Sequence, residues 1–340
     1  MNISKQIVGI DVSKDTLNVC YGTYGPNNER NFSKTKIFSN NKEGHKKLLN
    51  WADTQTTLKD RDHRTSVIFV CEATGIYHEN LLYFLSSNNM PVSVILPNKA
   101  KAFSRTRDMK SKTDKIDARM LTELGLEKEL KLWKNPNITL KKLKQLSRAI
   151  KTIKDKQTAV KNQLHAIDHS YESNELIRST LLEELAMHKK NIKKYEKAIK
   201  ELIKADKVLE QKINNILPAK GIGLSSIVTV ISETDGFALI ENSKQLASYA
   251  GMDVVHRESG LYKGKTKISK KGNSHIRSSL YMPALSAKKS NRKFKEFYDR
   301  IIEKRKIPGI AIIAVARKIL LLIYILWKKN ELYDPNYKTI

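Results

Sequence analysis

The chain has 340 residues, of which 63 are Lys or Arg and 35 are Asp or Glu, for a formal charge of +28 at pH 7. This length can bury at least one full core, and two domains are the natural expectation. So large an excess of positive charge favours a polyanionic partner, DNA or RNA. Cys20 and Cys71 both lie in apolar runs, which indicates reduced core thiols and argues against a disulfide or zinc framework.

No segment is expected to cross a membrane. The sequence has no long apolar stretch before Asp11, so we expect no signal peptide. The most apolar stretch, residues 309–327, carries Arg317 and Lys318 near its middle, and a spanning helix would have to bury both charges. We therefore expect a core or interface helix there, in a soluble, cytoplasmic and nucleoid-associated protein.

The first 130 residues alternate between strand and helix patterns. Their order is three strands, helix, strand, helix, strand and helix, which indicates an α/β domain with an antiparallel hairpin beside parallel strands. Sites in such sheets form outside the carboxyl ends of strands, where Asp11 and Glu72 are expected. The predicted strands are 6–13, 15–22, 31–38, 66–71 and 91–96; the predicted helices are one capped by Asn40 or Asn41 that runs to about residue 52, one at 77–87, and helical segments after 96.

A further pair of acids lies in the segment 111–121, which has helical character. Asp114 and Asp117 are three residues apart, so on a helix both carboxylates lie on one face. Two like charges held so close repel, and a protein tolerates them if both stay in water or share a cation. A lone pair of this kind is best explained as exposed and solvated, but Asp11 and Glu72 at predicted strand ends favour a shared cation.

The four carboxylates Asp11, Glu72, Asp114 and Asp117 predict a site for a hard cation. Oxygen ligands without a competing cluster of His or Cys select Mg²⁺ or Mn²⁺. Two such ions can clamp the attacking and leaving oxygens of a phosphodiester. In so basic a chain, acids clustered near a phosphate make sense when metal ions neutralise them.

Heptad patterns occupy the region that we assign to residues 131–217. The polar stretch 168–174 separates two apolar seams, so we expect two long helices that form a helical hairpin or a dimerising coiled coil. A plain helical core without protein partners is the alternative, and the Lys, Glu and Gln residues on the outer faces favour the coiled coil. The seams use positions 143, 146, 150, 153, 160, 164 and 167, and then 185, 192, 195, 199, 202, 209, 213 and 216.

Two features after residue 218 suit nucleic acid. Gly221-Ile222-Gly223 opens a predicted helix whose N-terminal N–H groups suit a phosphate, although a simple interhelical turn explains the tripeptide as well. The stretch 257–273 is a loop rich in Lys and Gly, and composition alone fits a solvated loop equally. The expected nucleic-acid contacts are Lys220, Gly221, Gly223, Arg257, Tyr262, Lys263, Lys265, Lys267, Lys270, Lys271 and Arg277.

Ser259 lies beside this loop, within reach of a DNA strand. A serine hydroxyl is a poor nucleophile until a base, a lowered pKa or a metal activates it, and only His256 is close in sequence. From the residues alone, an ordinary loop or cap serine is the simpler interpretation, and Ser269, Ser274, Ser278 and Ser279 would be equally eligible.

Seven segments in order resemble the IS110/IS1111 family of insertion-sequence transposases, which includes related DNA invertases. They span nearly the whole chain apart from the heptad region and the tail. One departure is Lys220, where many relatives have proline before the GIG turn. The segments are GIDVSK at 9–14, EATGIY at 72–77, KTDKIDARML at 112–121, GIG at 221–223, QLASYAGM at 245–252, RESG at 257–260 and SKKGNSHIRSSLYMPA at 269–284.

The resemblance implies an α/β RNase H-like (RuvC-like) N-terminal domain at 1–130 with Asp11, Glu72, Asp114 and Asp117 as its DEDD acids. A helical coiled-coil region at 131–217, a mostly α-helical C-terminal transposase domain at 218–330 and a tail at 331–340 follow. The resemblance also makes Ser259, in the ESG motif, the expected nucleophile. It implies a recombinase that acts on donor and target DNA, guided by a noncoding RNA, as a dimer or tetramer.

Three other functions remain open from the residues. A metal-dependent nuclease of the Holliday-junction resolvase type would use the same acids with water as the nucleophile. A non-catalytic nucleic-acid-binding scaffold would leave the acids incidental. An actin-like phosphotransferase shares the first strand pattern, but it needs further phosphate loops that we do not find, and it leaves the basic charge unexplained.

Overall fold

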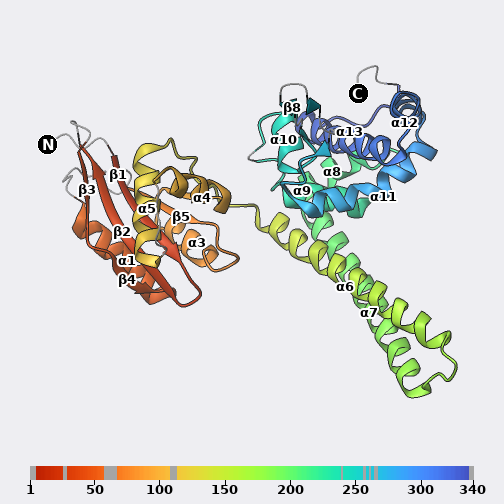
Figure 1. Ribbon diagram of the computed structural model, residues 1–340, viewed down its shortest axis with the longest axis horizontal. Coiled ribbons are helices and arrows are strands. Elements are labelled where there is room, and N and C mark those ends of the chain that lie inside the picture. The colour runs from red at the N-terminus through yellow and green to blue at the C-terminus, as the bar shows by residue number, and fades with distance from the viewer. Residues whose placement is uncertain are drawn as a thin grey trace. The chain divides into compact units, whose positions relative to one another are not determined.

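The computed structural model describes residues 5–25, 29–56, 67–107, 113–238, 240–255, 258–259, 262–263 and 267–336. Its contacts divide the chain into two compact units, an N-terminal unit of residues 1–135 and a C-terminal unit of residues 136–340 (Figure 1). The predicted division into three regions and a tail stays a prediction.

The N-terminal unit is built on a six-stranded sheet with helices packed against it (Figure 1). Its strands are β1 Lys5–Val12, β2 Thr16–Tyr24, β3 Arg30–Phe32, β4 Lys36–Ser39, β5 Val67–Glu72 and β6 Val92–Ile95, and its helices are α1 Lys42–Gln55, α3 Glu79–Ser87, α4 Pro97–Thr106 and α5 Asp114–Glu127. The strand order is β3-β2-β1-β5-β6, and β4 also pairs with β2. β1 is antiparallel to β2 and parallel to β5, which confirms the predicted hairpin beside parallel strands.

The two faces of this sheet carry separate cores, because side chains alternate along each strand. Val8 and Ile10 of β1 join the core that includes Leu48 of α1 and Leu81 of α3. Ile7 lies in the other core, together with Leu121 of α5. The single third strand expected at 31–38 is instead two short strands, β3 and β4, which pair with opposite ends of β2.

The C-terminal unit is mostly helical and begins with a long helical hairpin. Its helices are α6 Ile138–Asp168, α7 Glu175–Ala205, α8 Lys207–Ile216, α9 Leu224–Glu233, α10 Ser243–Tyr249, α11 Ser274–Ser290, α12 Arg292–Arg305 and α13 Pro308–Lys329. α6 and α7 run beside each other, and Asn174 caps α7 after the predicted bend (Figure 1). The second long helix was expected to reach residue 216, but it ends at Ala205 because the Asp206 side chain caps a new helix by accepting from the Leu209 N–H.

α13 is a long apolar helix. It is long and apolar enough to cross a membrane by length and composition, but half of its apolar window is buried inside the protein. Val315, Ile319 and Ile323 are fully buried in the large core that α13 shares with α8, α9 and α11. The burial agrees with the expected core helix.

The stretch expected to be a flexible loop contains short strand pairs. β7 Val254–Val255 pairs with β10 Lys267–Ile268, and between them β8 Glu258–Ser259 pairs with β9 Tyr262–Lys263, both antiparallel. The β-branched residues Val254, Val255 and Ile268 suit an extended backbone, which explains why the base of this stretch pairs despite its lysines and glycines. We call residues 254–268 the serine ribbon.

Candidate active site

Asp11 and Glu72 lie side by side at one edge of the sheet. β1 and β5 are parallel, and Ile10 is the register partner of Cys71, so the next residue of each strand is Asp11 or Glu72. Residues two apart on a strand face the same side of the sheet, so Asp11 lies on the same face as Gly9, and Glu72 on the same face as Val70. Val70 belongs to the core beneath α5. Both acids therefore belong to the face that α5 covers, at the carboxyl ends of parallel strands.

α5 crosses this face with its N-terminus directed to the same edge. A Cβ on Gly9 would lie 2.5 Å from the Ala118 carbonyl oxygen, and a Cβ on Gly125 would lie 2.7 Å from the Ile7 side chain. Moving from Ile7 to Gly9 along β1 therefore corresponds to moving back about two turns along α5, from Gly125 to Ala118. The next step along β1, to Asp11, leads to the first turn of α5.

That first turn carries the other two acids. Thr113 caps α5 by accepting from the Ile116 N–H, and Asp114 and Asp117 both fall in the first turn. The positive end of the helix dipole stabilises carboxylates at this position, which gives the pair a structural reason to exist besides metal binding. The fold thus directs the four predicted acids, from β1, β5 and α5, to one edge of the N-terminal unit.

Among the residues that the structure describes, no three His, Cys, Asp or Glu side chains are close enough together to hold a metal ion. The acids therefore share an edge without forming a closed ligand group. Their oxygen donors fit a hard divalent cation. Burial, together with the neighbouring Glu72 carboxylate, raises the pKa of Cys71 to about 12. Its thiol lies in the core on the opposite face of the sheet from the acids, so it does not belong to their ligand set.

The serine ribbon is anchored at its base in the C-terminal unit. The Ser269 N–H donates to the Asp253 carbonyl at 2.9 Å, and the Asn273 N–H donates to the Tyr249 carbonyl at 2.7 Å. The Arg277 guanidinium donates to the Ala250 carbonyl at 2.8 Å, so this predicted nucleic-acid residue holds the end of α10. Ser259 belongs to β8, and its side chain lies outside what the structure describes.

Beneath that base lies a buried carboxylate that the sequence analysis did not single out. The Glu233 side chain is 1% exposed, and Arg148 of α6 donates to both of its oxygens, at 2.6 and 2.9 Å. The Asn273 amide donates to the same carboxylate at 2.7 Å, and the Tyr249 hydroxyl donates to the Glu233 carbonyl at 2.9 Å. This Glu233 cluster joins the hairpin helix α6 to both ends of the segment that carries the serine ribbon.

The protonation state of Glu233 follows from these partners. Burial alone would raise the pKa of its carboxyl, but the hydrogen bonds from Arg148 and Asn273 and the nearby Lys144 lower the pKa below its usual value. The carboxylate is therefore charged at neutral pH. A lone acid at the end of the apolar run 224–233 was the sequence signal for such a buried pair.

The glycines of the GIG turn have different environments. Gly221 has φ +92°, and a Cβ there would lie 2.5 Å from the Ala287 Cα of α11, so this glycine permits the turn before α9 to pack closely against α11. Gly223 begins α9 with open space around it, and Lys220 is exposed. The packing supports the interhelical-turn interpretation for Gly221, and phosphate binding stays a prediction.

The remaining predicted contacts surround the serine ribbon. Lys267, Lys270 and Lys271 are exposed at its base, where they are open to a nucleic-acid backbone. Arg257 and Lys265 lie outside the described residues, and Tyr262 and Lys263 are described only by their backbone, in β9.

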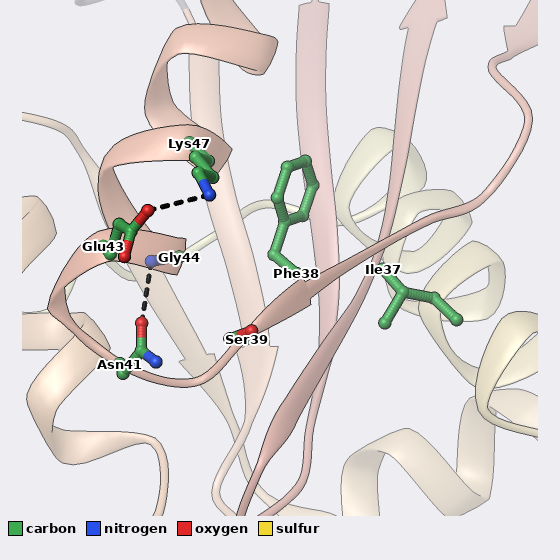
Figure 2. A pocket seen from close by; sticks show the side chains of 7 residues that line it. All are labelled: Ile37, Phe38, Ser39, Asn41, Glu43, Gly44 and Lys47. Carbon is green, nitrogen blue, oxygen red and sulfur yellow. Dashed lines mark hydrogen bonds and ion pairs between the residues drawn. The ribbon is translucent and has the colours of Figure 1, made fainter.

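One hollow of about 250 Å³ lies between β4 and the start of α1, and none of the four acids lines it (Figure 2). The Lys47 ammonium pairs with the Glu43 carboxylate at 2.8 Å, and the Asn41 side chain caps α1 by accepting from the Gly44 N–H at 2.9 Å. These polar groups satisfy one another, so the hollow offers no free ligand set.

Comparison with known proteins gives matches along most of the chain. A family model described as "Transposase" matches residues 8–169, and one described as "Transposase IS116/IS110/IS902 family" matches residues 214–299. The chain is 27% identical to the pilin gene-inverting protein of Moraxella lacunata over 338 residues, covering 98% of both chains. The pilin gene-inverting protein of Moraxella bovis is 26% identical over 335 residues, again covering 98% of both.

Proposed function

This chain belongs to the IS110 family of transposases, a DNA recombination family, and from that premise we propose that it cuts and rejoins DNA with Ser259 as its nucleophile and a divalent cation held by Asp11, Glu72, Asp114 and Asp117. The observation that carries the proposal is the direction of the four acids, from β1, β5 and α5, to one edge of the N-terminal unit. We propose in addition that this unit is a RuvC-like, RNase H-type domain.

The proposed step is a transesterification. The Ser259 hydroxyl oxygen forms a bond to a DNA phosphorus while the bond from that phosphorus to one strand oxygen breaks. The leaving oxygen takes up a proton, and the serine proton passes to a base. Because one phosphodiester replaces another, a strand hydroxyl can reverse the step on a new partner and rejoin the DNA. Hydrolysis by water would not conserve the bond in this way.

Mg²⁺ or Mn²⁺, when bound by the four acids, supplies the positive charge that a phosphorane-like transition state needs. The side chains would close around the ion from an open arrangement. The acids themselves position that charge, and the exposed Lys267, Lys270 and Lys271 would attract the DNA backbone to the base of the serine ribbon.

We propose that the protein acts as a dimer or tetramer joined through α6 and α7, and that a noncoding RNA pairs with donor and target DNA to choose the sites. Exposed apolar side chains on α7 support the assembly: Leu176 is 76% exposed and Met187 is 53% exposed. The charge of +28 favours polyanionic partners, and a second polyanion beside the DNA fits it. The two Moraxella relatives, named for inverting a pilin gene, support a recombination reaction that rejoins what it cuts.

The test combines purified protein, DNA that carries the element's junction, Mg²⁺ and RNA transcribed from the flanking noncoding region. We expect recombined DNA only when all four are present, and none with Asp11→Ala. Recombination without RNA would contradict the guide. Cleavage without rejoining would point to a resolvase-like nuclease, and DNA binding without Mg²⁺-dependent cleavage would point to a scaffold.

A further inference from the structure

The turn after Glu72 displays apolar side chains to solvent. Ile76 is 72% exposed and Tyr77 is 43% exposed, and Leu96, the first residue after β6, is 53% exposed. Single exposed apolar residues are common on protein surfaces. These three, however, follow two neighbouring strands at the carboxyl edge, where Glu72 pairs with Ile95, so they lie at the same edge of the sheet as Glu72.

The turn that carries Tyr77 is held in place. Gly75 has φ +54°, a left-handed conformation that favours glycine, and the Tyr77 N–H donates to the Thr74 carbonyl at 3.2 Å. The Asn40 amide donates to the Tyr77 carbonyl at 3.1 Å and to the Ser13 carbonyl at 2.8 Å. Asn40 therefore ties the turn after Glu72 to the loop that follows Asp11.

A buried histidine orients that tie. The His45 Nε2 lies 2.9 Å from the Asn40 Oδ1. Because the Asn40 amide nitrogen already donates twice, its Oδ1 must accept, so His45 carries a proton on Nε2. His45 is 3% exposed and packs against the Phe84 ring at 5.5 Å, which fixes the imidazole and with it the amide. The ring of Tyr77 is thus presented from a backbone with little freedom.

The surrounding chemistry identifies the occupant. α4 begins directly after Leu96 and carries the exposed cations Lys99 and Lys101. An aromatic ring and lysines at one edge of a domain form a pattern by which proteins bind single-stranded nucleic acid, with the ring against a base and the ammonium groups on phosphates. The net charge of +28 favours such an anion over a second copy of this chain. In a fully paired duplex the base faces are covered, so the ring suits an unpaired base.

We propose that Tyr77 stacks on an unpaired nucleobase of the DNA substrate beside the acidic site, with Ile76 against the same nucleotide. Asn40 is a positioning residue that keeps the Tyr77 turn in a fixed relation to the strand of Asp11. The proposal rests on the proposed function only in taking DNA as the substrate. It adds a requirement that the acids alone do not impose, namely that the bound DNA presents an unpaired base at this edge.

The test uses the full-length protein without divalent cations, so that DNA binds without being cut. The probe is a duplex with one unpaired 2-aminopurine, compared with the same duplex fully paired. Stacking on Tyr77 quenches the 2-aminopurine fluorescence. We expect Tyr77→Ala to lose the quenching and to weaken binding of the unpaired probe about 5- to 150-fold, and Tyr77→Phe to retain both. Affinity for the paired duplex should not change.

Two further variants make the result specific. Ile37→Ala removes another exposed apolar side chain of the same unit, 56% exposed, and should leave the quenching intact. Asn40→Ala keeps the ring but frees its turn, so the quenching should fall while the protein stays folded by circular dichroism.

Several outcomes would overturn the proposal or separate it from the proposed function. The proposal would be overturned if Tyr77→Ala quenched and bound the unpaired probe as the wild type does. It would also be overturned if Tyr77→Ala changed the oligomeric state of the protein while DNA binding stayed intact. Quenching that depends on Tyr77 in a protein that never cuts DNA would sustain this inference and reject the proposed function. If Tyr77→Ala left recombination unaffected and the wild type showed no quenching, the proposed function would stand and this inference would be rejected.

Discussion

Replacing Gly9 with alanine tests how the fold places the acids. A Cβ at this position would lie 2.3 Å from the Thr122 Oγ1 and 2.5 Å from the Ala118 carbonyl oxygen and the Thr122 backbone nitrogen. Ordinary contacts begin near 3.4 Å, so α5 must move away from β1 by roughly 1 Å. Two of the obstructing atoms belong to the backbone, so a rotamer change cannot relieve the clash.

The shift has two measurable consequences. Overpacking of this kind destabilises by about 1–3 kcal/mol, which corresponds to a fall in melting temperature of about 4–12 °C for a unit of this size. A misplacement of catalytic groups by about 1 Å costs about 100-fold in rate. We therefore expect Gly9→Ala to lose about 100-fold in Mg²⁺-dependent DNA cleavage at a temperature where the protein is still folded.

Gly25→Ala is the matched control in the same unit, because its Cβ would meet only ordinary contacts at 3.6 Å or more. Melting curves and initial cleavage rates of both variants decide the matter. If Gly9→Ala melts early but cuts at the wild-type rate, the packing of α5 on β1 does not position the acids, and the reasoning fails.

Three further predictions concern the acids, the buried cluster and the GIG turn. Asp114→Asn, at an exposed helix start, should lower the melting temperature by no more than about 4 °C, because it removes only the favourable interaction of the carboxylate with the helix dipole. It should raise the Mg²⁺ concentration needed for half-maximal cleavage at least about tenfold in a metal titration, and an unchanged titration would remove Asp114 from the ligand set. Arg148→Met should cost about 3 kcal/mol, the low end for breaking a buried pair, since the guanidinium is 45% exposed. The folded-state pKa of Glu233 lies below its unfolded value of about 4.3. The loss of stability in Arg148→Met should therefore be constant above pH ~5 and shrink as the pH falls through the lowered pKa. Denaturant melts in which this loss does not change with pH would contradict the prediction. Gly221→Ala, strained at φ +92° and obstructed by α11, should lower the melting temperature while Gly223→Ala does not; equal melting would refute the packing role.

The elements that carry the acids were predictable because their signals are local. Apolar runs ending in Asp11 and Glu72 marked strands, and parallel strands bring their carboxyl ends to one edge. The spacing of Asp114 and Asp117 marked one helix face. The close approach that directs the first turn of α5 to the same edge depends on Gly9 beneath α5, more than 100 residues away in sequence, and no local pattern reports such a contact.

The roles of polar side chains whose partners lie far away in the sequence were harder to predict. Asn40 and Asn41 were equal candidates for a helix cap; Asn41 is the cap, and Asn40 instead links two loops. Glu233 finds Arg148 at a separation of 85 residues, so its role follows only from the folded C-terminal unit. The break at Asp206 was missed because apolar residues continue the heptad pattern across it.

The central claim is that a serine of this chain attacks DNA with the help of the acids. The most direct measurement looks for DNA covalently attached to the protein after denaturation, with wild type, Ser259→Ala and Asp11→Ala compared in the presence and absence of Mg²⁺. We predict an adduct in the wild type that needs Mg²⁺ and is lost in both variants. Cut DNA without an adduct, produced equally by Ser259→Ala, would mean that water is the nucleophile and would contradict the account.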